Sequence, residues 1–179
     1  MSAVKSMVFT VMGPDRPGLV ESLAAVVREN GGSWQQSSMA HLADQFAGVV
    51  SIVVPADYEA VLKEGLNRLT ESGLRIVCAG EESGGSDITG IEADLRITGN
   101  DRPGIVHDVS AVLQRLGINV ERMDTHCAPA PMSGDGMFHA GLRIRLEDLA
   151  SVDALGDALE ALSEDLTVDF LVDPTATLA

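Results

Sequence analysis

The sequence predicts an α+β protein made of two copies of one small βαββαβ unit. An octapeptide of the form Gly-x-Asp-Arg-Pro-Gly-x-Val occurs twice, at residues 13–20 and 99–106. Each copy stands between an apolar run typical of a strand and an apolar run typical of a helix, which indicates a duplicated module. The copies align without a gap as far as Gly31 and Gly117, and they align again after a loop at 128–136 whose length differs. Two small domains in tandem are therefore expected.

The elements of the first copy follow from the spacing of its apolar residues. Short apolar or alternating runs predict strands, and apolar residues at helical spacing that end before a glycine predict amphipathic helices. Ala43 and Asp44 separate two strand-like runs, and so short a connection favours an antiparallel hairpin. The predicted elements are, in order, a strand at 7–12, a helix at 19–27, strands at 33–42 and 46–54, a helix at 58–72 and a strand at 74–78.

The second copy repeats this order, and two crossovers of this kind give an antiparallel four-stranded sheet with both helices on one face, the ferredoxin-like arrangement. Its predicted elements are a strand at 94–98, a helix at 105–116, strands at 119–127 and 137–146, a helix at 152–162 and a strand at 167–172. The predicted domains are 1–80 and 93–173, separated by a linker at 81–92 rich in Gly, Ser and acid and followed by a tail at 174–179.

The sheet faces that lie away from the helices are predicted to differ between the copies. In the second copy the strand at 137–146 alternates apolar and polar residues, so its outer face is expected to contact water. In the first copy the outward side chains are too apolar to leave in water over several adjacent positions, and we expect another subunit to cover them. These outward residues are Val8, Thr10, Met12, Ala47, Val49, Ser51 and Val53.

Composition excludes several classes of function. With 27 acidic and 12 basic residues the formal charge is −15, which disfavours direct contact with nucleic acid or anionic lipid. Cys78 and Cys127 lack a CxxC spacing, so we expect free thiols and neither a disulfide framework nor a zinc site. No stretch approaches the roughly 20 apolar residues that cross a bilayer, and no apolar run follows a basic N-terminal segment. A cytoplasmic protein is expected.

The segments 15–18 and 101–104, both Asp-Arg-Pro-Gly, are the candidate site. Proline suits the first turn of a helix, and glycine leaves the next backbone amides open to a ligand carboxylate near the positive end of the helix dipole. Asp15 and Asp101, at or next to the helix cap, could accept the ammonium group of the same ligand. A small amino acid would satisfy both. The simpler interpretation is that Asp caps the helix, Pro begins it, Gly packs against the sheet, and nothing binds.

The repeated Gly-x-Asp-Arg-Pro-Gly-[Leu/Ile]-Val, leading into a helix within βαββαβ, resembles the signature of ACT domains, small regulatory modules that often bind amino acids. The resemblance covers nearly the whole chain. Two copies without an attached enzyme resemble the free-standing tandem ACT proteins of the glycine cleavage system transcriptional repressor family, and the proline-containing loop at 128–136 suits that subgroup. In that family, modules pair side by side into one continuous sheet, and effectors lie at the pairing interface against the loop between first strand and first helix.

By this resemblance, the ligand-binding positions are Gly13, Asp15, Gly18, Leu19 and Val20 in the first copy and Gly99, Asn100, Asp101, Gly104, Ile105 and Val106 in the second. Asn100 offers amide donors and an acceptor, whereas the equivalent Pro14 offers only a carbonyl. If only one loop binds a ligand, we expect it to be the second.

The resemblance implies a non-catalytic, homodimeric regulator without a cofactor. It would bind a small amino acid, glycine or similar, at its domain interfaces and modulate a protein partner, such as a transcription activator, as a repressor of the glycine cleavage type. A structural interaction module that binds no ligand and an accessory regulatory subunit of an amino-acid or one-carbon enzyme remain as alternatives.

Enzyme and metal chemistry find little support in the sequence. Gly-x-Ser-x-Gly, GxxxxGK[ST] and HExxH motifs are absent, so no catalysis is expected. His126, Cys127 and His139 are the one plausible metal cluster, but residues 126 and 127 point to opposite faces of a strand and would not converge on one ion. We therefore expect no metal.

Overall fold

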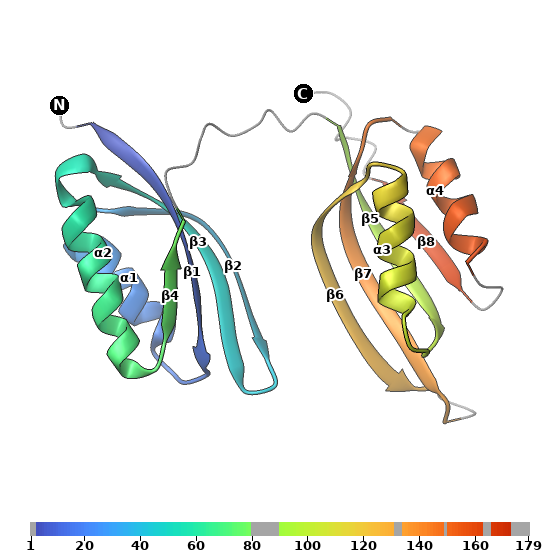
Figure 1. Cartoon of the computed structure of the whole chain (residues 1–179), viewed down its shortest axis with the longest axis horizontal. Coiled ribbons are helices and arrows are strands. Elements are labelled where there is room, and N and C mark those ends of the chain that lie inside the picture. The colour runs from blue at the N-terminus through green and yellow to red at the C-terminus, as the bar shows by residue number, and fades with distance from the viewer. Residues whose placement is uncertain (1–2, 80–89, 131–133, 149, 163–165, 173–179) are drawn as a thin grey trace. The chain divides into compact units, whose positions relative to one another are not determined.

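The computed structural model describes residues 3–79, 90–130, 134–148, 150–162 and 166–172. The chain separates into two compact units, residues 1–86 (unit 1) and 87–179 (unit 2), and each is treated by itself (Figure 1). The expected tail at 174–179 and most of the expected linker at 81–92 lie outside the described residues.

Unit 1 has the predicted order of strands and helices. Its elements are β1 (Val4–Pro14), α1 (Leu19–Glu29), β2 (Ser33–Leu42), β3 (Gln45–Pro55), the 3-10 turn η1 (Ala56–Tyr58), α2 (Glu59–Arg68), the 3-10 turn η2 (Leu69–Ser72) and β4 (Arg75–Cys78). The helix predicted at 58–72 is α-helical only in its middle, and its 3-10 end stops at Gly73, which has φ +91°. Ala43 and Asp44 form the β2–β3 turn with φ 48° and 60°, as a two-residue hairpin requires.

The four strands of unit 1 form one antiparallel sheet in the order β2-β3-β1-β4. Helices α1 and α2 lie on the same face of that sheet (Figure 1). Gly13, near the end of β1, is close-packed, because a Cβ there would lie 2.8 Å from Leu74 Cδ2 and 3.0 Å from the Gly73 oxygen. The sheet therefore fixes the position of the strand-to-helix segment 15–18, which we call the corner of unit 1; the segment 101–104 is the corner of unit 2.

Unit 2 repeats this topology, with strand order β6-β7-β5-β8. Its elements are β5 (Ile91–Asn100), α3 (Ile105–Arg115), β6 (Asn119–Pro129), β7 (Gly136–Leu146), α4 (Ala150–Glu160) and β8 (Thr167–Val172). The prediction placed residues 91 and 92 in the linker, and this is wrong. Both belong to β5, because Ile91 pairs with Leu146 and Glu92 with Arg145, which extends the ladder beyond the predicted strand. The ferredoxin-like fold is confirmed in both units.

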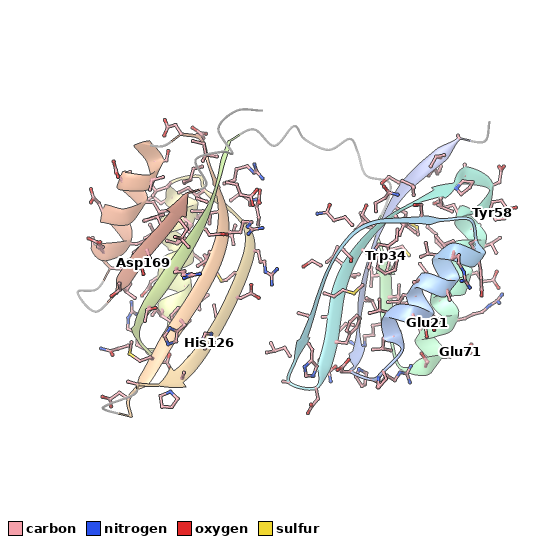
Figure 2. The ribbon with its side chains drawn as sticks, turned by 180° about the vertical axis from the view of Figure 1, so that it is seen from behind. Glu21, Trp34, Tyr58, Glu71, His126 and Asp169 are labelled. Carbon is pink, nitrogen blue, oxygen red and sulfur yellow. The ribbon has the colours of Figure 1, made fainter. Side chains whose placement is uncertain are left out.

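Each unit has its own apolar core between sheet and helices. In unit 1, Phe9 and Ile52 of the sheet and Leu23 and Leu62 of the helices are fully buried. Trp34 of β2 packs edge-on against Phe9, with ring centroids 6.5 Å apart (Figure 2). Burial of such side chains contributes about 1.5–3 kcal/mol each relative to exposure. The core thus anchors the first helix of the unit against the strand that precedes it.

The outer sheet faces differ as the sequence predicts. In unit 2, Arg143 lies 3.1 Å from Asp94, and Arg145 lies 2.6 Å from Glu121, so charged pairs cross the strands. In unit 1 the same face carries Val49, 48% exposed, and Met12, 46% exposed. That another subunit covers this apolar face stays a prediction.

Candidate functional site

The first helix of each unit begins at a glycine in the left-handed conformation. Gly18 precedes α1 with φ 90° and ψ 0°, and Gly104 precedes α3 with φ 86° and ψ −1°. Neither helix start is capped by a side chain. The predictions that an aspartate caps each helix and that proline begins it are therefore wrong: Asp15 and Asp101 lie three residues before the capping glycine.

A tight turn explains why Pro103 and Gly104 stand together before α3. The Ile105 N–H donates to the Arg102 oxygen over 3.4 Å, which closes the four-residue turn 102–105. Pro103 at its second position and left-handed Gly104 at its third are the arrangement of a type II turn. Only glycine adopts φ near +90° there without strain, so this turn, and not the helix cap, determines the Pro-Gly pair.

The turn leaves the helix start open. The first N–H groups of an α-helix have no intrahelical acceptor, and the helix dipole adds partial positive charge at the same place. A Cβ built on Gly18 or on Gly104 would meet no atom within 4 Å, so open space surrounds both glycines. Each corner can therefore admit a small anionic group.

The neighbouring hairpin holds the aspartate of each corner by its backbone. The Asp15 N–H donates to the Asp44 oxygen over 3.0 Å, and the Asp101 N–H donates to the Gly136 oxygen over 2.8 Å. A Cβ on Gly136 would lie 3.2 Å from the Asp101 Cβ, so this contact is close. The hairpin thus fixes each carboxylate beside the turn, with both aspartates exposed to solvent.

The two aspartates have chemically different neighbours. In unit 1, His41 Nε2 lies 3.7 Å from Asp15 Oδ2. In unit 2, Cys127 occupies the matching position, because His41 pairs with Phe46 and Cys127 with Phe138. Desolvation, followed by the negative charge of Asp101 and a hydrogen bond to it, raises the pKa of the Cys127 thiol. The Asp101 carboxylate therefore has a neutral neighbour, whereas Asp15 has a basic one.

Sequence reasoning did not identify His41 and Cys127 as the neighbours of the two aspartates. The signal was the alignment of Phe46 with Phe138, because it also places His41 and Cys127 at the same point of the two hairpins.

The arginines of the corners differ too. Arg102 Nη2 lies 2.7 Å from Asp108 Oδ2, and a hydrogen bond from this guanidinium, more than the one from His107, lowers the pKa of Asp108. In unit 1 the equivalent of Asp108 is Ser22, whose hydroxyl donates to the Gly18 oxygen over 3.0 Å. Within the described part of the chain, Arg16 has no carboxylate partner. Unit 1 therefore presents an unneutralised cation at its corner.

The structure divides the proposed binding residues into a buried and an exposed set. Leu19 and Ile105 are each 4% exposed, so only their backbone could contact a ligand. The buried residues are Gly13, Leu19, Gly99 and Ile105, and the exposed ones are Asp15, Gly18, Val20, Asn100, Asp101, Gly104 and Val106. The exposed set lies at the turn, the strand end and the first helical turn.

The two stacked histidines of unit 2, His126 and His139, lie apart from the residues of the corner. His126 (labelled in Figure 2) stacks on His139 with ring centroids 4.9 Å apart. The next residue, Cys127, contacts Asp101 instead and does not join the histidines. Among the described residues, no three His, Cys, Asp or Glu side chains gather as a metal site would need.

No described helix has the length and apolar character to cross a membrane.

Comparison with solved structures supports the fold assignment. A protein of unknown function from Galdieria sulphuraria matches with a TM-score of 0.79 and 26% identity, over 96% of this chain and 99% of the other. The structure of a candidate glycine cleavage system transcriptional repressor matches with a TM-score of 0.70 and 16% identity, over 96% and 100% of the two chains. No match is found among curated proteins.

Two family models, both described as ACT domain, match residues 5–79 and 93–164. Each match contains one of the corners and one complete first helix. The chain belongs to the ACT-domain family and consists of two such domains in tandem.

Proposed function

We propose that this chain is a non-catalytic regulator that binds a small amino acid, glycine or one of similar size, at its two corners. ACT domains are regulatory modules, which supports a role in control rather than in catalysis. The observation that carries the proposal is the repeated corner itself: an uncapped helix start and, beside it, an aspartate held by the neighbouring hairpin.

The carboxylate and the ammonium group of a zwitterionic amino acid match the two features of a corner, the open helix start and the aspartate. A carboxylate is stabilised at the open N–H groups of the helix start, where the dipole adds about 0.3–1 kcal/mol. The ammonium group is placed at Asp101 or Asp15, as an ion pair with charge-assisted hydrogen bonds. Because Leu19 and Ile105 are buried, the side chain of the ligand would face Val20 or Val106, and this favours small ligands.

The corner of unit 2 is the stronger candidate. The Cys127 thiol is uncharged and is only a weak hydrogen-bond donor to Asp101, so it competes less for the carboxylate than the basic imidazole of His41, which lies 3.7 Å from Asp15. Asn100, at the exposed end of β5, adds an amide that Pro14 cannot supply. The uncharged neighbour of Asp101 and the amide of Asn100 therefore both favour ligand binding at the corner of unit 2.

Ligand binding would affect a protein partner because it is thermodynamically linked to the pairing of two copies of the chain. If two copies pair and the ligand contacts both, it favours the paired state by its differential affinity, with typical coupling of about 1–3 kcal/mol. The acidic surface, at −15 overall, suits a basic protein partner such as a DNA-binding transcription activator. A homodimeric, cytoplasmic repressor of the glycine cleavage type is the specific form that we propose.

Thermal shift with a panel of single amino acids tests the ligand. We expect one or a few to raise the melting temperature at millimolar concentration, and Asp101→Asn to abolish most of the gain. Asp15→Asn should remove less of it, and Asp169→Asn, an exposed aspartate on β8 (Figure 2), should remove none. If no amino acid stabilises the parent chain, the corners bind nothing of this class and the structural-module alternative replaces the proposal.

A further inference from the structure

The apolar outer face of the unit 1 sheet is hollow and not flat. A cavity of about 520 Å³ opens on the side of the sheet away from α1 and α2. Its wall includes Met12, Ala40, Ala47, Val49, Val77 and Arg75. The volume lies within the range of about 300–1,000 Å³ that is typical of small-molecule sites.

Small side chains create this hollow at a place where unit 2 is filled. Ala40 and Ala47 pair across β2 and β3, and the equivalent cross-strand pair of unit 2 is His126 and His139. Those two imidazoles stack on each other and occupy the surface. The outer sheet face of unit 2 has a smaller hollow of about 220 Å³ elsewhere, and charged residues such as Asp94 and Arg143 line it. The larger, apolar hollow of unit 1 results from its two alanines.

Among the described residues, a single charged side chain lines the hollow. Arg75, at the start of β4, is exposed, and the described residues give it no carboxylate partner, although the chain has 27 acidic and 12 basic residues. On the equivalent face of unit 2, Arg122, Arg143 and Arg145 are each paired with an acid. Arg96 on that face also has no carboxylate partner among the described residues, but it lies among charged side chains, whereas the surroundings of Arg75 are uncharged. An apolar wall beside one unneutralised guanidinium is complementary to a molecule with an apolar body and one anionic group.

A second copy of the chain is a poor occupant of the hollow. Two copies meeting through the same face would place one hollow against the other, which leaves an unfilled space, and protein interiors tolerate few voids larger than a water molecule. The contact would also desolvate Arg75 without a counter-ion from this face, whose other lining residues are uncharged. A separate small molecule avoids both costs.

We propose that this hollow is a second binding site, independent of the corners, for an amphipathic carboxylate. The apolar body lies over Ala40, Ala47 and Val49, and the carboxylate accepts hydrogen bonds from the Arg75 guanidinium. The site revises the expectation that another subunit alone covers this face.

Three probes with one body and different head groups test the site: 4-phenylbutyrate, 4-phenylbutanamide and 4-phenylbutylamine. Calorimetric titration of the full chain is expected to show 4-phenylbutyrate binding about tenfold tighter than the amine. Arg75→Gln should remove that preference, and Arg28→Gln, an arginine on the helical side of unit 1, should leave it intact. Ala47→Phe, which fills the hollow from an exposed position, should abolish binding of all three probes.

Other outcomes overturn the proposal. Equal binding of the three probes, unchanged in Arg75→Gln, would mean a non-specific apolar surface. No binding of any probe, together with a dimer that Val49→Asp converts to a monomer, would show that a second copy occupies the face. Because Asp101→Asn leaves the hollow intact, loss of amino-acid binding in that variant does not affect this test.

Discussion

At the scale of single residues, the two left-handed glycines determine the geometry of the corners. Gly18 and Gly104 stand directly before the first helix of each unit in the left-handed conformation, and neither is crowded by a neighbour. Their role is therefore conformational, because φ near +90° strains any residue with a Cβ. An alanine at either position would distort the amides that a ligand carboxylate needs.

Gly18→Ala should lower the free energy of unfolding of unit 1 by about 1–2 kcal/mol, the cost of a left-handed alanine. Urea denaturation followed by fluorescence measures it, because Trp34 is the only tryptophan of the chain and packs in the unit 1 core. Gly18→Asn should cost less, since asparagine adopts this conformation more readily. Equal stability of the alanine variant and the parent chain would contradict the conformational role.

The residue scale is also where sequence reasoning failed in part. The Asp-Arg-Pro-Gly segments were correctly placed between strand and helix, but proline fits both the first helical turn and the second position of a type II turn. The sequence alone does not distinguish these. The φ of Gly104 and the hydrogen bond from the Ile105 N–H to the Arg102 oxygen place Pro103 at the second position of a turn.

At the scale of elements, an ion pair connects α3 to its corner, and the residues that the structure describes give α1 no such pair. Arg102 reaches forward to Asp108 in the first turn of α3, whereas Ser22 in α1 bonds the helix backbone instead. The pair holds the corner of unit 2 against its helix, so the two corners differ in how firmly they are fixed.

This pair predicts a pH-dependent contribution to stability. The pKa of Asp108 is lowered in the folded state from its ordinary value of 3.8, so the pair stabilises above that value and is lost as pH falls through the lower folded-state pKa. Arg102→Gln should therefore lower the melting temperature at pH near 7. The difference should disappear in strong acid, where Asp108 is protonated in both chains.

Arg16→Gln is the matched control, because Arg16 has no carboxylate partner among the described residues. It should leave the melting temperature unchanged at both pH values. A loss of stability in Arg102→Gln that persists in strong acid would show that the side chain acts through packing rather than through its charge.

Periodicity was sufficient to predict the strands and helices, their order and the two-residue turn at Ala43 and Asp44. Periodicity did not predict the neighbours of the two aspartates, because the contact of His41 with Asp15 joins β2 to the segment after β1 and depends on side-chain direction. The hollow of unit 1 was only half predicted. The apolar residues were identified, but the empty space above Ala40 and Ala47 depends on the relative size of neighbouring side chains in the folded sheet.

At the scale of the whole molecule, the two ACT domains share a fold and differ in surface chemistry. Unit 1 combines an apolar hollow with a corner whose arginine has no carboxylate partner among the described residues. Unit 2 combines a charged sheet face with a corner whose aspartate has a neutral neighbour. Duplicated domains that kept one task would not need to differ at both places. This difference accords with the proposal that the corner of unit 2 is the stronger amino-acid site.

A titration of the ¹⁵N-labelled chain with the stabilising amino acid, read by two-dimensional NMR, tests the central claim most directly. The account predicts that the backbone amides of Gly104, Val106 and His107 shift in one saturable step. Asp101→Asn should remove these shifts. Unmoved amides at both corners, with shifts confined to other residues, would contradict it.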